Sequence, residues 1–107
     1  MMAEPERVGS ILERLAARMG ITSRLEKEKA VVLWEEVVGE TAARRAEAVS
    51  IKGGRLVVVV ESSAWVQQLA LLKEGIIAKI NSRIGKPVVE DIIFRIGEIG
   101  KEKSNGG

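Results

Sequence analysis

The sequence contains no cysteine, no histidine and no tyrosine, and only one phenylalanine. The absence of cysteine excludes disulfides, thiolate zinc sites and cysteine nucleophiles. The absence of histidine removes the usual general base near neutral pH and the commonest metal ligand. The sequence also lacks the G-x-x-x-x-G-K-[ST] phosphate loop and the G-x-S-x-G nucleophile elbow. We therefore expect a protein that is not an enzyme and that uses no cofactor or metal.

Long hydrophobic runs are missing as well. No apolar segment approaches the roughly 20 residues that a transmembrane helix requires, and the first residues are charged and polar, unlike a signal peptide. We therefore expect a cytoplasmic protein with no membrane partner. A length of 107 residues predicts one domain with one modest core. The 17 basic and 15 acidic residues give a net charge of +2. The protein is therefore not a polycation, but a local basic patch on its surface is possible.

The clearest local pattern is a strand followed by a helix. Residues 56–60 read Leu-Val-Val-Val-Val, a β-branched run that is too short for a helix and predicts a central strand. Ser62 or Ser63 can cap the next helix, because a serine hydroxyl accepts a hydrogen bond from an N–H group of its first turn. From Trp65 onward, apolar residues recur at spacings of three and four, which predicts one amphipathic helix over 63–84.

Helical spacing, capping residues, alternation and glycine pairs predict the remaining elements. We expect Leu25, Val31, Trp34 and Val38 to share one side of the second helix, and Val49 and Ile51 to share one face of the first strand. The predicted ranges are helices near 7–19 and from Thr22 or Ser23 to Val38, a short turn over 42–46, and strands over 47–52, 55–61 and 88–96.

These elements predict an α+β fold in the order α-α-β-β-α-β. Because Gly53-Gly54 joins the first two strands, they must be antiparallel, while the third can return parallel to the second through a right-handed crossover. A sheet of three strands needs cover, so the helices should pack mainly on one face and form a two-layer sandwich. We expect residues 1–97 to form this single domain and 98–107 a short flexible tail.

Basic residues provide candidate nucleic-acid contacts. They occur in several clusters along the chain, and the default interpretation of each cluster is solvated surface charge. Together, the clusters could converge in the fold into one phosphate-binding strip. Such a strip would bind nucleic acid weakly and with a steep dependence on salt. Aromatic stacking platforms are nearly absent, so sequence-specific reading of single strands is not expected. The candidates are Arg44, Arg45, Lys52, Arg55, Lys79, Arg83 and Lys86.

Several apolar residues provide candidate partner contacts. If alternate residues of the central strand face the helices, Val57 and Val59 point the other way, together with Ile93 and, as a further member, Val89. That face either binds a partner or a second copy of the chain, or lies under an N-terminal helix. We expect Trp34 to lie in the core. Trp65 lies on the apolar side of its helix and is expected in the core as well, but its place in the first turn leaves one edge available to a partner. The partner candidates are Val57, Val59, Trp65, Leu71 and Ile93.

Several short motifs follow one another along the chain: Leu33-Trp34-x-x-Val37-Val38-Gly39, Ile51-x-Gly53-Gly54-x-Leu56-x-Val58-x-Val60, Ser62-Ser63-Ala64-Trp65-x-x-x-Leu69, Leu72-Lys73, Ile80-Asn81 to Gly85, and Ile92 to Arg95. Taken in this order, over about residues 8–97, they resemble the DciA family. The resemblance implies a KH-like fold and a role as operator or loader of the bacterial replicative hexameric helicase, without ATPase activity of its own. It also implies DNA binding, including to single strands, and it identifies no residue-level helicase contact.

Three functions remain open at this point. The resemblance favours a non-enzymatic replication-initiation factor of the bacterial cytoplasm, associated with the nucleoid, that binds the replicative helicase and, weakly, single-stranded or forked DNA. The alternatives are a KH-like RNA-binding factor of ribosome assembly and an adaptor that forms a homodimer through its sheet. The segment Gly97-Glu98-Ile99-Gly100 matches the GxxG of KH domains, but it follows the last strand and does not lie between two helices.

Overall fold

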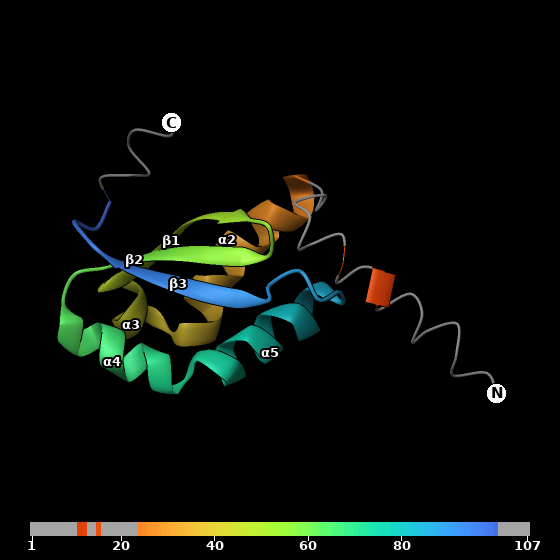
Figure 1. Cartoon of the computed structure of the whole chain (residues 1–107). Helices are drawn as coiled ribbons and strands as arrows, with labels where there is room; N and C mark the ends of the chain where they lie inside the picture. Colours follow the sequence, from red (N-terminus) through yellow and green to blue (C-terminus); the bar gives the residue numbers. More distant parts are fainter. Residues whose placement is uncertain (1–10, 13–14, 16–23, 101–107) are drawn as a thin grey trace.

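The chain folds into a three-stranded mixed sheet with helices on one face, which confirms the predicted α+β class (Figure 1). This computed structural model describes residues 11–12, 15 and 24–100. No helix in that part of the chain is long and apolar enough to cross a membrane. The elements are α2 (Arg24–Val38), α3 (Glu40–Ala43), β1 (Ala46–Lys52), β2 (Arg55–Val60), α4 (Ser63–Leu71), α5 (Lys73–Ile84) and β3 (Asp91–Ile96).

The sheet has the predicted topology. Its strand order is β1-β2-β3, with β1 antiparallel and β3 parallel to β2. Gly53 and Gly54, at φ 58° and 80°, form the turn between β1 and β2. Both residues adopt the positive φ that a two-residue hairpin turn demands and that glycine reaches without steric cost.

A β-bulge in β1 overturns the predicted alternation. The register with β2 shifts between Ala48 and Ser50, so Val49 is an extra residue in its strand. Ala48 and Ile51 are both buried, although they are three positions apart. The prediction that Val49 and Ile51 share a face is wrong, because strict alternation assumes an uninterrupted ladder.

The long helix predicted over 63–84 is two helices that meet at Leu72. This residue has φ −102° and ψ 2°, and its N–H donates to the carbonyl of Leu69 at 3.0 Å, which tightens the turn. The helix before the break, α4, packs on β2 and β3, whereas α5 after it packs mainly on α2. The observed order from α2 to β3 is therefore α-α-β-β-α-α-β, in which the first two helices are α2 and the short α3. Apolar spacing alone predicts a single helix, because the spacing continues across the break.

The core lies between the sheet and the helices, and Trp34 is its largest side chain. Trp34 is 2% exposed, and its indole Nε1–H donates to the carbonyl of Ala46 at 2.9 Å. The prediction that Trp34 is a core residue is confirmed. Leu25, expected on the packed side of the same helix, is instead 61% exposed.

Residues 88–90, which were predicted to belong to the last strand, precede β3, and the side chain of Asn81 forms hydrogen bonds with their backbone at Val89. Asn81 of α5 donates to the carbonyl of Val89 and accepts from its N–H, both at 2.8 Å. Val88 and Val89 are buried, but the strand begins only at Asp91. Because Asn81 satisfies the backbone of Val89, this residue needs no ladder partner. Gly85, in the left-handed conformation at φ 86°, ends α5 as predicted.

Two predicted N-terminal features fall mostly outside the described residues. Of the helix predicted near 7–19, only Ile11, Leu12 and Leu15 are described, and all three are helical. The predicted caps at Thr22 and Ser23 also lie outside the described part. Further on, α3 replaces the predicted turn over 42–46, since β1 already begins at Ala46.

Candidate functional site

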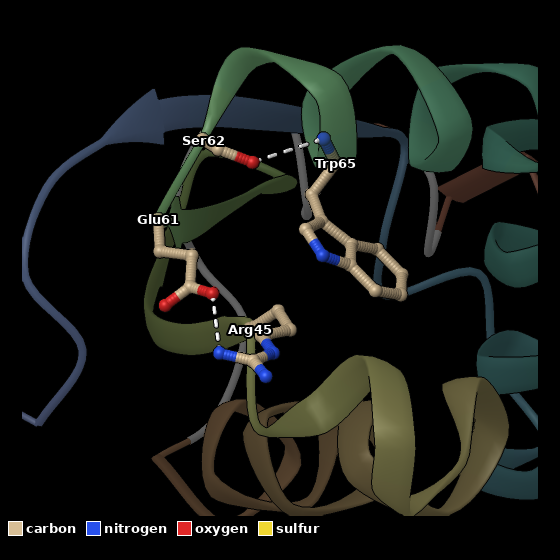
Figure 2. Close-up of polar contacts among 4 residues, drawn as sticks. All are labelled: Arg45, Glu61, Ser62 and Trp65. Carbon is tan, nitrogen blue, oxygen red and sulfur yellow. Dashed lines mark hydrogen bonds and ion pairs between the residues drawn. The ribbon is translucent and has the colours of Figure 1, made fainter.

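The corner between β2 and α4 fixes the position of Trp65. Ser62 is extended, at φ −152° and ψ 157°, and its hydroxyl accepts the N–H of Trp65 at 3.3 Å, which confirms the predicted serine cap. Beside it, Arg45 forms an ion pair with Glu61 at 2.7 Å, and the N–H of Glu61 donates to the carbonyl of Arg45 at 3.0 Å. Figure 2 shows the indole extending from α4 toward α3. The corner therefore holds the indole over the space between these two helices.

An apolar hollow of about 200 Å³, which we call the Trp65 groove, opens beside this indole. It lies between the α4–α5 pair and the end of α2 with α3. Only Gln68 and Lys79 among its lining residues carry polar side chains. The lining residues are Val37, Val38, Ala42, Trp65, Gln68, Leu69, Leu72, Gly75, Ile76 and Lys79.

The junction between α4 and α5 extends the groove onto the surface. Leu71 is 87% exposed, and its neighbour Leu72, which lines the groove, is 59% exposed. A single exposed leucine is ordinary, but two beside an apolar groove form a patch. Of the predicted partner candidates, Trp65 lines the groove, whereas Leu71 is exposed and precedes the lining residue Leu72 in the chain. Sequence reasoning missed Leu72, because its spacing assigned it to the buried side of a continuous helix.

The open face of the sheet carries a second surface, which we call the hairpin hollow. Lys52 pairs with Arg55 across β1 and β2, so their side chains share a face. Val57 pairs with Ile93 across β2 and β3 and lies on that same face. Together with Gly53, these residues line a shallow hollow. Two predicted nucleic-acid candidates and two predicted partner candidates therefore form one site.

Val59 is not exposed, contrary to prediction: only 1% of it is accessible. The chain beyond β3 turns back over this end of the sheet. The N–H of Gly97 donates to the carbonyl of Val60 at 3.0 Å, and the N–H of Gly100 donates to the carboxylate of Glu47 at 2.9 Å. A Cβ at Gly97 would lie 3.1 Å from Cγ1 of Val59. Residues 97–100, at the boundary between the predicted domain and the predicted tail, therefore cover this end of the sheet. Val89, the further member of this face, is buried as well.

The seven basic candidates do not form one strip. Four of them are neutralised locally by ion pairs, whereas Lys52, Arg55 and Lys79 form no ion pair within residues 24–100. Lys52 and Arg55 lie at the hairpin end of β1, Arg44 and Arg45 precede its other end, and Lys79 lines the Trp65 groove. The ion pairs are Arg44–Glu40 at 2.7 Å, Arg45–Glu61 at 2.7 Å, Arg83–Glu36 at 3.2 Å and Lys86–Glu26 at 2.7 Å.

An ion pair that the sequence did not suggest joins α5 to the start of β3. The ammonium of Lys73 lies 2.9 Å from Oδ1 of Asp91. This hydrogen bond is the main reason that the pKa of Asp91 falls below its ordinary value of 3.8, and the N–H of Ile92 and the charge of Arg55 lower it further. Partial burial opposes the shift. The pair fixes the helix start beside the strand that carries Ile93.

Comparison with known proteins assigns the chain to a family. Residues 7–94 match the family model described as "Dna[CI] antecedent, DciA". The chain is 32% identical over 89 residues to a UPF0232 protein of Rhodococcus jostii, covering 83% of this chain and 47% of that protein. It is 30% identical over 89 residues to a UPF0232 protein of Mycobacterium tuberculosis, covering 83% and 48%.

The chain spans about half the length of the curated relatives it matches. The matched residues include the Ser62–Trp65 corner, the lining of the Trp65 groove and the hairpin hollow. The match covers well over half of the 107 residues, and the chain belongs to the DciA family.

Proposed function

We propose that this domain is a non-enzymatic factor of DNA-replication initiation that binds the bacterial replicative hexameric helicase and assists its loading on DNA. The observation that carries the proposal is the family match over residues 7–94. Membership of the DciA family implies an operator role toward this helicase. The two surfaces of the domain suggest how the role is divided between protein and DNA contacts.

The Trp65 groove is the proposed helicase contact. It is apolar, its lining includes the exposed Leu72, which follows the exposed Leu71 in the chain, and it contains one cation, Lys79, that forms no ion pair within the described residues 24–100. Such a surface fits an amphipathic segment that inserts apolar side chains and places a carboxylate beside Lys79. Tryptophan is enriched among the residues that dominate the free energy of binding at interfaces, and burial of an exposed leucine adds the favourable free energy of removing apolar surface from water.

The hairpin hollow is the proposed DNA contact. Lys52 and Arg55 project from one face, and neither is neutralised by an ion pair in the described part of the chain. Two phosphate contacts yield weak binding that does not depend on sequence and weakens with salt. The apolar floor of Val57 and Ile93 can contact a sugar or the face of a base.

The alternatives find less support. KH domains clamp the nucleic-acid backbone with a GxxG loop, but the junction between α4 and α5 reads Leu72-Lys73-Glu74-Gly75 and has a single glycine. A homodimer through the sheet would need an open apolar face, and the segment after β3 covers Val59. We therefore propose helicase binding over RNA binding and over a sheet-mediated dimer.

A direct binding experiment tests the proposal. The domain, labelled with a fluorophore, is titrated with the purified replicative helicase of the same bacterium at low salt, and the dissociation constant is measured by anisotropy. Leu72→Glu should weaken binding roughly tenfold or more, the effect of losing about 1.4 kcal/mol at a central contact. Ile93→Glu, a matched change of an exposed apolar residue on the sheet face, should leave affinity nearly unchanged.

The possible outcomes distinguish whether the domain binds the helicase from which surface it uses. Absence of wild-type binding at micromolar concentrations would count against a helicase partner altogether. Binding that Ile93→Glu weakens more than Leu72→Glu would retain the partner and move the contact to the hairpin hollow. Circular dichroism of both variants checks that each remains folded.

A further inference from the structure

The sheet has two edge strands, β1 and β3, and only one of them is interrupted (Figure 1). The bulge at Val49 lies in β1, and a bulge is one of the features that keep an edge strand from pairing with another chain. In contrast, β3 is regular, because all of its residues from Asp91 to Ile96 pair with β2 without a register shift. This strand therefore keeps the geometry that a further strand needs.

The backbone groups of β3 alternate between β2 and the open side. The N–H of Gly97 donates to the carbonyl of Val60 at 3.0 Å, so the odd-numbered residues of this segment bond to β2. In a parallel ladder, the residues between them direct their N–H and C=O groups to the other side. Ile92, Phe94 and Ile96 therefore present these groups outward, where no strand of residues 24–100 pairs with them.

Exposed apolar and charged side chains accompany this edge. Ile93 is 40% exposed and Ile96 is 60% exposed. Asp91 and Arg95 lie on the same face of the strand as Ile93, because alternate residues of a strand share a face. An edge that combines outward backbone groups with exposed apolar side chains favours the addition of a strand.

We infer that β3 pairs antiparallel with β3 of a second copy of the chain, with the two-fold axis at Ile93. Three antiparallel registers, centred on Ile92, Ile93 or Phe94, bring outward-facing residues opposite one another. Only the register centred on Ile93 places Asp91 of one copy opposite Arg95 of the other, and the symmetry repeats this pair. The occupant is a second copy because the edge is complementary to itself in charge.

This register has specific consequences for the contacts of β3. The two Ile93 side chains form a pair without hydrogen bonds, where side chains approach most closely. The N–H of Ile92, which donates to Oδ1 of Asp91 at 2.8 Å, would donate instead to the carbonyl of Phe94 of the second copy. Because a carboxylate accepts several hydrogen bonds, Asp91 can keep its ion pair with Lys73 and also bind the opposing arginine.

The pairing joins the edges of two sheets and does not require an open apolar face. It leaves the open face of each sheet accessible, and it does not depend on the proposed helicase role. Two short edge strands bury less than about 1,200 Å², the size of weak and transient interfaces, so we expect association at protein concentrations on the order of 100 µM.

Disulfide formation tests the register, because the chain contains no cysteine of its own. The full chain carrying Ile93→Cys is oxidised at about 100 µM, where the weak dimer is expected, and the covalent dimer is followed over time. At the two-fold axis the paired Cα atoms lie about 4.5 Å apart, which a disulfide can span.

The matched control is Ile96→Cys, in the same strand and more exposed. In this register, position 96 lies six positions, or roughly 20 Å, along the strand from the same position of the second copy. Ile93→Cys should therefore form the covalent dimer roughly tenfold or more faster than the control, because pairing raises the effective concentration of only the first thiol.

A charge exchange tests the pairing without a cross-link. Arg95→Asp and Asp91→Arg each place like charges opposite one another, so each variant alone should associate roughly tenfold or more weakly than the wild type in sedimentation experiments. An equimolar mixture of the two variants restores two pairs of opposite charge and should recover association. Circular dichroism checks the folding of each variant, and the cysteine variants keep the inference testable if a charge variant does not fold.

Other outcomes overturn the inference. Equal rates for the two cysteine variants would mean that contacts between copies are not centred on Ile93. A mixture of the charge variants that associates no better than its components would exclude pairing of Asp91 with Arg95. A wild-type chain that stays monomeric up to about 1 mM would exclude a second copy as the occupant of this edge.

Discussion

Substitution of the two tryptophans should affect different properties of the domain. Trp34 is 2% exposed and donates its indole hydrogen to the carbonyl of Ala46 at 2.9 Å. Trp65 is half-buried and lines an open groove. We predict that Trp34→Phe destabilises the domain without altering helicase affinity, and that Trp65→Ala lowers helicase affinity.

The magnitude for Trp34→Phe has two sources. Loss of the indole donor leaves the buried carbonyl of Ala46 without its partner, which costs about 1–3 kcal/mol. Loss of the second ring leaves a cavity beside Ala30 and the start of β1, which adds to that cost. The sum is about 2–4 kcal/mol, a large part of the roughly 5–15 kcal/mol that stabilises a typical domain.

Urea unfolding followed by far-ultraviolet circular dichroism measures this loss. With a dependence of about 2 kcal/mol per molar urea, the midpoint should fall by roughly 1–2 M. Because the chain has two tryptophans and no tyrosine, Trp34→Phe also leaves Trp65 as the sole strong emitter. Its emission should shift to shorter wavelength when a partner fills the Trp65 groove and removes water from the indole.

A small effect would refute the reasoning. If Trp34→Phe lowered the free energy of unfolding by less than about 0.5 kcal/mol, the buried hydrogen bond and the packing of Trp34 could not have the importance assigned to them. If it weakened helicase binding while the protein remained fully folded, Trp34 would belong to the interface. An emission spectrum of Trp65 that helicase leaves unchanged would count against the groove.

Three further changes test other parts of the structure. Ser62→Ala should cost about 0.5–2 kcal/mol, measured by urea unfolding, because the N–H of the first turn of α4 loses its acceptor. Asp91→Asn should remove more stability near pH 7 than at a pH below the lowered pKa of Asp91. The ion pair of Asp91 stabilises the fold above the ordinary pKa of 3.8, and this contribution is lost as pH falls through the lowered pKa. Since this pair is partly exposed, we expect about 1 kcal/mol or less, and an equal loss at both pH values would contradict the assignment. Arg55→Ala should lower the salt dependence of single-strand binding by about 0.7 in log–log slope, and the matched Arg44→Ala, which removes a cation already paired with a glutamate, should change it less.

The sequence predicts those parts of the fold that depend on local chemistry. A run of β-branched residues forms β2, Gly53-Gly54 forms the hairpin, and Ser62 caps α4. Each of these depends on neighbours within a few residues, so the residue types alone define the conformation. The spacing of apolar residues also identified the helical stretch after Ser62.

The errors arise where distant residues decide the local conformation. The bulge at Val49 exists only in relation to the ladder with β2, and the break at Leu72 lets α4 and α5 pack on different neighbours. Val59 of β2 is covered by Gly97, which follows β3. Gly97, the residue that permits this close approach, was present in the sequence, but nothing local connects it with Val59.

The sequence also could not predict which basic residues of the candidate site are paired with carboxylates. A sequence displays every basic residue but not the carboxylate beside it, and Arg83 pairs with Glu36, 47 positions away. The ion pairs therefore remove several candidates for a phosphate-binding strip. Lys52 and Arg55 retain that role because the hairpin turns them away from the helices, toward the uncovered face of the sheet.

The separation of the two surfaces has a mechanistic consequence for the proposed role. The Trp65 groove is built among helices, whereas the hairpin hollow lies on the sheet face that these helices do not cover. A helicase segment bound in the groove would therefore leave Lys52 and Arg55 open to DNA. The same domain could contact both partners at once, and bound helicase should change the affinity for DNA only through long-range electrostatics, which about 0.15 M salt screens within roughly 8 Å. A loss of DNA binding on helicase addition at that salt concentration would mean that the two partners compete for one surface.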